Sequence, residues 1–184
     1  MRVSKDHLVE GLDVSIKTAD WWDDHLNEAM ALYGIDLHRQ RVAAFIAQVA
    51  HESGRFHYVR EIWGPTRAQA RYEGRKDLGN TQPGDGHRFL GRGLIQLTGR
   101  ANAKRMTHEL RKKITTAPDF EVQPELLELP RWAALSAGCF WDWMALNALA
   151  DEGAITAISK KVNGGFNGLA ERKKYWKQLL EVLP

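Results

Sequence analysis

Residues 40–54 of the chain read QRVAAFIAQVAHESG, and no other segment predicts the architecture as directly. Its apolar side chains recur at the spacing of one buried helix face: Val42, Phe45, Ile46, Val49 and Ala50. Glycine commonly follows the last turn of a helix, so Gly54 predicts where this helix ends. Glu52 then lies in the last turn, on or beside the apolar face. The pattern predicts a buried helix that presents a carboxylate at its C-terminal end.

Further helices are expected on both sides of this one, over residues 20–33, 132–149, 155–162 and 171–183. Residues 132–149 are apolar nearly all round, which predicts a central buried helix. Between the helices, residues 63–99 are rich in glycine, and residues 88–90 and 94–98 are short enough for strands of a small sheet. The expected fold class is α+β, mainly α, with a small glycine-rich β-sheet lobe.

Length and composition indicate an ordinary soluble domain. The 184 residues contain 43% hydrophobic and 27% charged residues, and no repeat or linker divides them. We therefore expect a single domain over residues 1–184 without a separate binding module. The formal net charge of +3 is consistent with a polyanionic target such as bacterial wall or nucleic acid, or simply with a basic solvated surface.

Glu52 is the first candidate for chemistry. A carboxylate at the edge of an apolar helix face loses solvation, which favours its protonated form, as a general acid requires. The structural alternative is a glutamate paired with Arg55 or Arg60. A second carboxylate is needed to activate water, and the chain after Glu52 offers four: Glu61, Glu73, Asp77 and Asp85.

Other chemistries are less well supported. His51, Glu52 and His57 do not have the spacing of a zinc-binding helix, because four residues, one of them the helix-ending Gly54, separate His57 from the first pair. We therefore predict no metal site. Cys139, the only cysteine, lies in an apolar segment and is expected to be a buried, unreactive thiol.

Six segments carry a family resemblance that spans nearly the whole chain: residues 44–54, 72–80, 84–86, 88–102, 163–165 and 169–172. In this order they resemble glycoside hydrolase family 19, the chitinase family whose phage branch supplies endolysins. The resemblance implies a lysozyme-like fold and single-displacement inversion without a cofactor. Two positions depart from family members: Ala101 stands where plant chitinases carry tyrosine, and Ile62 follows the second glutamate where many phage members have asparagine.

The resemblance also implies roles for individual residues. Glu52 matches the general acid, Glu61 the general base, and Thr98 the hydroxyl that helps to hold the attacking water. Polar residues that line the substrate cleft are matched by Gln96, Asn102, Asn163 and Arg172. Glu73, the rival for the base, is expected to be a hairpin residue that pairs with an arginine such as Arg75 or Arg92.

The function predicted from these residues is an endolysin-type peptidoglycan hydrolase that cuts β-1,4 bonds and acts as a monomer. No secretory signal or membrane span is seen, so we expect synthesis in the cytoplasm and release to the wall by a separate holin, with no membrane insertion. The main alternative is a chitinase. A remote alternative is a non-catalytic wall- or nucleic-acid-binding module that uses the basic runs 111–113, 160–161 and 172–174; nucleic acid is not the expected partner.

Overall fold

The computed structural model describes residues 1–184 as a mainly helical protein. Its elements, in chain order, are α1 (Lys5–Leu12), α2 (Ile16–Leu32), α3 (Arg39–Glu52), α4 (Arg67–Ala70), η1 (Lys76–Leu78), α5 (Asp85–Arg88), α6 (Arg100–Arg111), η2 (Pro124–Glu128), α7 (Pro130–Trp143), α8 (Leu146–Asp151), α9 (Ile155–Asn163) and α10 (Leu169–Val182). None of these helices is long and apolar enough to cross a membrane.

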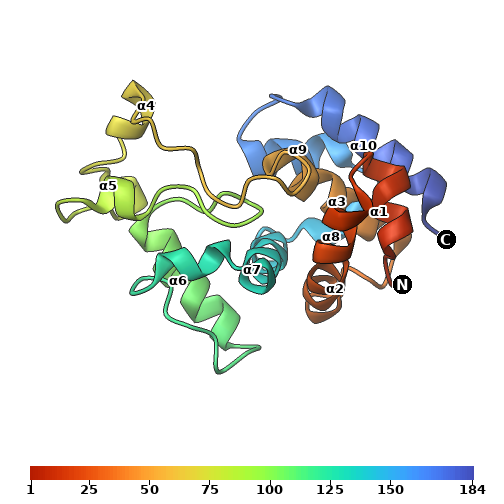
Figure 1. Cartoon of the computed structure of the whole chain (residues 1–184), viewed down its shortest axis with the longest axis horizontal. Helices are drawn as coiled ribbons and strands as arrows, with labels where there is room; N and C mark the ends of the chain where they lie inside the picture. The colour runs from red at the N-terminus through yellow and green to blue at the C-terminus, as the bar shows by residue number, and fades with distance from the viewer.

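The helices α1, α2, α3, α7, α8, α9 and α10 form the body of the molecule, while α4, α5 and their connections form a lobe that extends to one side (Figure 1). Helix α10 packs against α3 and α1, and α2 packs against α7. Every residue from Val42 to Ala50 is buried. The prediction of a buried helix here is therefore confirmed, and its last residue is Glu52.

The chain leaves α3 through a left-handed turn. Three consecutive residues, Gly54, Arg55 and Phe56, have positive φ angles of 56°, 59° and 67°. The hydroxyl of Ser53 donates to the carbonyl of Val49 at 2.6 Å and accepts the N–H of Phe56 at 2.9 Å. These hydrogen bonds satisfy the open end of the helix, and the turn directs the next residues toward the lobe.

The prediction of one long helix over residues 132–149 is wrong in one respect, because these residues belong to two helices. Helix α7 ends at Trp143, Ala145 adopts a left-handed conformation with φ of 52°, and α8 begins at Leu146. The side chain of Asn147 accepts the indole N–H of Trp141 at 2.8 Å and donates to the carbonyl of Tyr33 at 3.1 Å. This tertiary contact fixes the break, which has no glycine or proline to mark it in the sequence. Cys139 of α7 is buried, as expected, and burial raises the pKa of its thiol to about 11.

The lobe contains less sheet than the sequence predicts. Residues 85–88 form α5 rather than leading into a strand, and residues 93–96 form a tight turn. Only two isolated antiparallel bridges occur, between Arg60 and Arg92 and between Arg92 and Leu97. The mainly helical, lysozyme-like class remains as predicted, but the expected strands at 88–90 and 94–98 are wrong, because Arg88 ends a helix, residues 94–96 form a turn and only Leu97 makes a bridge.

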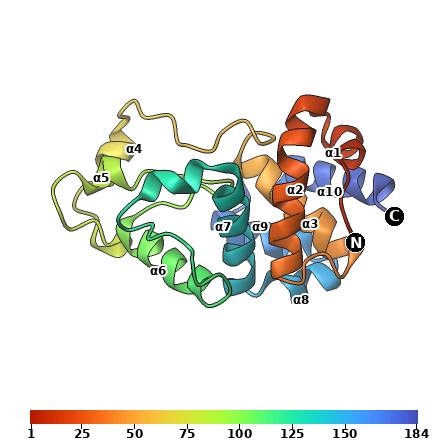
Figure 2. The ribbon, with the colours of Figure 1, turned by 60° about the horizontal axis from the view of Figure 1, so that its bottom comes forward.

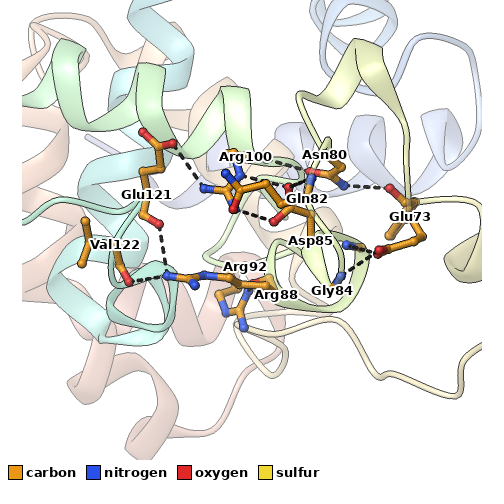
Figure 3. A network of polar contacts seen from close by, with 12 residues as sticks. Glu73, Asn80, Gln82, Gly84, Asp85, Arg88, Arg92, Arg100, Glu121 and Val122 are labelled. Carbon is orange, nitrogen blue, oxygen red and sulfur yellow. Dashed lines mark hydrogen bonds and ion pairs between the residues drawn. The ribbon is translucent and has the colours of Figure 1, made fainter.

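Side chains hold the lobe together where a sheet was expected (Figure 3). Arg100, at the start of α6, pairs with the buried carboxylate of Asp85 at 2.5 Å and reaches Glu121 at 3.3 Å. The side-chain oxygen of Asn80 accepts the backbone N–H of Arg100 at 3.0 Å. Glu73 accepts two backbone N–H groups from the glycine-rich loop, those of Gly84 at 2.7 Å and Gly86 at 2.8 Å.

Asp85→Asn tests this arrangement. We expect it to lower the free energy of unfolding by about 3 kcal/mol near neutral pH, because Arg100 is left without its buried carboxylate. The hydrogen bonds from Arg100 lower the pKa of Asp85 below its ordinary value of 3.8, against the effect of burial. The stabilisation is therefore complete above that ordinary value and is lost as pH falls through the lowered pKa of the folded state.

Urea unfolding of both proteins, from about pH 7 down to about pH 2, measures this difference. The difference in the free energy of unfolding between wild type and Asp85→Asn should become smaller only at the acid end of this range. A gap of the same size at every pH would contradict the pairing of Asp85 with Arg100.

Candidate active site

Glu52, the last residue of α3, lies beside a buried cation. The guanidinium of Arg172, on α10, forms an ion pair with its carboxylate. The side chain of Arg172 is only 1% exposed, whereas that of Glu52 is 20% exposed. The partner of Glu52 is therefore Arg172, and neither Arg55 nor Arg60, the two arginines considered from the sequence, pairs with it.

A chain of polar contacts reaches from Arg172 into the core. Its Nη1 donates to the side-chain oxygen of Gln48 at 2.6 Å, and the amide nitrogen of Gln48 donates to the hydroxyl of Ser159 at 3.1 Å. Three helices, α3, α9 and α10, thus hold one guanidinium. Arg172 was expected to line the cleft, but its side chain is buried and contacts Glu52 and Gln48. Gln48 was not predicted, although a glutamine on an apolar helix face was a signal for it.

His51 precedes Glu52 and is also held by α10. Its Nδ1 lies 2.5 Å from a carboxylate oxygen of Glu171, whose other oxygen accepts the hydroxyl of Tyr175 at 2.8 Å. Gly168 lies so close to the His51 ring that a Cβ there would overlap it. Histidine, cysteine and carboxylate side chains form no group of three that could hold a metal ion.

Glu61 lies between α3 and α4, and three donors fix its carboxylate. One oxygen accepts the backbone N–H of Gly91 at 2.9 Å, and the other accepts the amide of Gln69 at 3.0 Å and the hydroxyl of Tyr72 at 3.3 Å. The backbone N–H of Glu61 also donates to the carbonyl of Gly91 at 2.8 Å. Burial and the negative charge of Glu61 raise the pKa of Tyr72, so its hydroxyl stays a donor.

Gln69 is a partner of Glu61 that sequence reasoning missed. It is buried and forms a capping box with Thr66 at the start of α4, and its side-chain oxygen accepts the backbone N–H groups of Gly64 and Thr66 at 3.1 and 2.8 Å. A threonine followed three residues later by glutamine is the sequence signal for such a box. One oxygen of the Glu61 carboxylate is therefore held by this small turn, and the other by Gly91.

The structure gathers three further predicted residues near Glu61. Gln96 and Glu61 both lie against Gly91: a Cβ built on Gly91 would lie 2.9 Å from the side-chain oxygen of Gln96 and 3.3 Å from a carboxylate oxygen of Glu61. The amide of Gln96 donates to the carbonyl of Gly93 at 3.0 Å. The hydroxyl of Thr98 donates to the carbonyl of Gln96, and the amide of Asn102 to the carbonyl of Thr98.

Asn163 belongs to the other side, with Glu52. It is exposed at the end of α9, and its amide donates to the carbonyl of Asn167 at 3.2 Å. The predicted residues thus form two groups: Glu52, Asn163 and Arg172 on the helical body, and Glu61, Gln96 and Thr98 on the lobe, with Asn102 of α6 bonded to Thr98. The segment 53–60 joins them, and its Tyr58 carbonyl accepts the amide of Gln96 at 3.4 Å.

Glu73 is placed differently from the expectation. No arginine pairs with it, because Arg75 pairs with Asp77 and Arg92 with Glu128. Both of its oxygens accept backbone N–H groups of the loop that contains Gly84 and Gly86 (Figure 3). Its carboxylate is thus engaged in holding the lobe's backbone.

No family model matches the chain, but comparisons with individual proteins do. A Haemophilus influenzae protein described as containing a glycosyl hydrolase family 19 domain is 27% identical over 176 residues, which cover 78% of this chain and 80% of that protein. An Arabidopsis thaliana endochitinase is 31% identical over 127 residues, covering 69% of this chain. The chain spans only 40% of the length of that plant enzyme.

Solved structures give the same fold. Chitinase C from Streptomyces griseus HUT6037 superimposes with a TM-score of 0.69 at 19% identity, covering 97% of this chain and 76% of that one. A bacterial family 19 chitinase gives a TM-score of 0.67 at 21% identity, covering 99% of this chain and 96% of that one. Likenesses at this level of identity establish the lysozyme-like fold.

Together the sequence relatives and the fold identify the chain as a glycoside hydrolase. Within that class it is a homologue of the family 19 enzymes, as the sequence segments predicted. The phage branch of that family stays a prediction.

Arg172→Gln separates the buried position of Arg172 from a direct contact with substrate. Because the guanidinium touches Glu52 and not the open surface, we expect kcat on any cleaved glycan to fall by roughly 10²-fold while KM changes little. Arg172→Lys should restore part of kcat, since it keeps the charge but not the planar contacts.

Steady-state kinetics of the folded variants, checked by circular dichroism, measure the split between kcat and KM. A large rise in KM with unchanged kcat would show that Arg172 binds substrate itself.

Proposed function

We propose that this protein hydrolyses β-1,4 bonds of an N-acetylated bacterial wall polysaccharide with inversion, with Glu52 as general acid and Glu61 as general base. The observation that carries the proposal is the unequal setting of the two carboxylates. Glu52 is paired with one buried cation at a helix end, whereas Glu61 is fixed by neutral donors from the lobe. Two carboxylates in different environments are what single-displacement glycoside hydrolysis requires.

Arg172 supports the role of Glu52 as acid. When Glu52 gives its proton to the glycosidic oxygen, a carboxylate is left behind, and Arg172 is already in place to stabilise that charge. Because three helices hold the guanidinium, little reorganisation is needed as the charge develops. The sequence predicted a desolvated carboxylate, whereas the structure places a buried cation against it, and in this proposal the cation acts on the carboxylate that is left after proton donation.

Glu61 is suited to the role of base. Its oxygens accept one backbone N–H, one amide and one hydroxyl, so the carboxylate cannot rotate freely. Gln96 and Thr98 lie on the same side of the molecule, where they can orient a water or an N-acetyl group. In this proposal the substrate lies between the helical body and the lobe, with Asn163 and Asn102 contacting it from either side.

Peptidoglycan is the proposed substrate, and an endolysin-type role follows from it. The named relatives favour a second candidate, since several of them are endochitinases. Both polymers contain β-1,4-linked N-acetylated sugars, so the same pair of carboxylates could serve either. The proposal keeps a monomer that is delivered to the wall by a separate holin, with neither nucleic acid nor membrane as a partner.

Glu52→Gln and Glu61→Gln should each lower kcat on purified sacculi by roughly 10²–10⁴-fold, because neither amide can transfer the required proton. Glu73→Gln is the matched control. It should lower the melting temperature, since an amide NH₂ would face a backbone N–H, yet leave kcat of the folded protein within about threefold of wild type.

Rates are measured on sacculi and on chitin, and mass spectrometry of the released reducing ends identifies the bond that is cut. Faster turnover of sacculi supports peptidoglycan, and faster turnover of chitin supports the chitinase. An inactive, folded Glu73→Gln beside an active Glu61→Gln would move the base to Glu73.

A further inference from the structure

Helices α9 and α10 carry a basic surface that the proposed active site does not use. Two adjoining hollows, of about 660 and about 460 Å³, open on these helices. Their walls share Lys173 and Lys177, so the two hollows are continuous. We call this region the lysine surface and define it by the lysines that line the hollows: Lys160, Lys173, Lys174 and Lys177.

The ammonium groups of the lysine surface lack acidic partners. None of the four takes part in an ion pair, and no aspartate or glutamate lines either hollow. Lys173 and Lys177 are four residues apart on α10, and Lys174 and Lys177 three apart, so each pair presents like charges on one helix face. Like charges at this spacing repel each other and slightly destabilise a helix. An anionic ligand would relieve this repulsion.

Two aromatic side chains lie among these lysines. Phe166 is 60% exposed, with the ammonium of Lys160 5.9 Å from its ring centre, and Trp176 is half-buried in the floor of the larger hollow. Exposed aromatic faces pack against sugar rings or apolar side chains at little entropic cost. The surface therefore offers both cationic and apolar contacts.

The lysine surface borders the candidate active site. Phe166 belongs to the connection between α9 and α10 (Figure 1), and Gly168 of the same connection lies against His51, next to Glu52. On α10, Arg172 points inward to Glu52, while its neighbour Lys173 faces the hollows. A polymer bound beside Glu52 would reach the lysine surface by crossing this one connection.

The chemistry of the surface distinguishes the two candidate substrates. Chitin is uncharged, whereas peptidoglycan carries carboxylates on its peptide side chains. A second contact on the same polymer also raises the effective concentration of the bond to be cut. A glycan with acidic side groups therefore suits this position better than a nucleic acid or a membrane, which would have no connection to Glu52.

We propose that Lys160, Lys173, Lys174 and Lys177 form a second substrate-binding surface, which holds the carboxylates of an anionic wall glycan beside the active site. This inference deepens the proposed function and rests on it in taking wall glycan as the substrate. The two active-site carboxylates do not distinguish peptidoglycan from chitin. The lysine surface adds a reason to expect a preference for peptidoglycan.

The test compares two triple variants that each remove three positive charges. Lys160→Gln, Lys173→Gln and Lys177→Gln are combined in one protein; Lys5→Gln, Lys17→Gln and Lys112→Gln, all away from the lysine surface, are combined in the control. Both are made in Glu52→Gln protein so that the wall stays intact. Binding to purified sacculi and to chitin particles is measured by sedimentation at about 50 mM and about 500 mM salt.

The lysine-surface triple should bind sacculi about tenfold more weakly than Glu52→Gln at the lower salt, with most of the salt dependence gone. The control triple should change sacculus binding by less than about threefold, and chitin binding should be similar in all three proteins. Equal losses in the two triples would overturn the proposal. So would lysine-dependent binding that is as strong on chitin as on sacculi.

Two further arms decide between partners. Binding is also measured to vesicles that contain about one part phosphatidylglycerol in four, and to duplex DNA. The proposal is overturned if the protein binds either one more tightly than sacculi and this binding depends on the three lysines. Because binding is measured apart from hydrolysis, the two claims fail separately. If binding depends on the lysines but the unmutated protein does not cleave sacculi, only the proposed function is contradicted. If sacculi are cleaved but binding does not depend on the lysines, only the proposed role of the lysine surface is contradicted.

Discussion

A buried guanidinium needs partners, and in this protein Gln48 and Glu52 accept from the two terminal nitrogens of Arg172, while its Nε has no hydrogen-bond partner. Removing a charge from water costs several kilocalories per mole, and the cost is offset only when its hydrogen bonds are made. The hydrogen bonds of Arg172 require α3, α9 and α10 to pack together. Its partners Glu52 and Gln48 come from α3, and Gln48 is oriented by Ser159 of α9. The same contacts fix the carboxylate of Glu52 at the end of α3. Packing and proposed chemistry thus depend on one ion pair.

The lobe follows a different physical rule. It has almost no regular backbone pairing, so its shape depends on side chains that accept backbone N–H groups or pair with arginine. Glu61, Glu73 and Asp85 all do so (Figure 3 shows the last two). Seen from the side, the lobe is joined to the body mainly by connections and by α6 beside α7 (Figure 2). The lobe therefore contains both a carboxylate that holds its glycine-rich backbone, Glu73, and one that is proposed to activate water, Glu61. Only their hydrogen-bond partners distinguish the two.

Local patterns in the sequence predicted what depends on local physics. The 3.6-residue period placed α3 within a residue at each end, and Gly54 marked its end. The break between α7 and α8 was missed because Ala145 carries no local signal and Asn147 makes its contacts with Trp141 and Tyr33. The strands of the lobe were overestimated because an apolar run such as 94–97 can be either a strand or a buried turn.

Side-chain partners were the least predictable part of the site. Glu52 was placed correctly at the end of α3, but its partner lies 120 residues away on α10, and nothing near it in the sequence indicates Arg172. Glu73 was assigned an arginine because arginines are its sequence neighbours, whereas backbone N–H groups brought close by the fold satisfy it. The family resemblance placed the chain among the family 19 homologues, and geometry then separated the residues of the body from those of the lobe.

The central claim is that Glu52 and Glu61 act from opposite faces of the scissile bond. Proton NMR of a soluble N-acetylated oligosaccharide, recorded within the first minutes of cleavage and before mutarotation, tests this claim most directly. Inversion predicts that the new reducing end appears first as the α anomer, because water activated by Glu61 attacks the face opposite the leaving group. A reducing end that appears first as the β anomer would contradict the account.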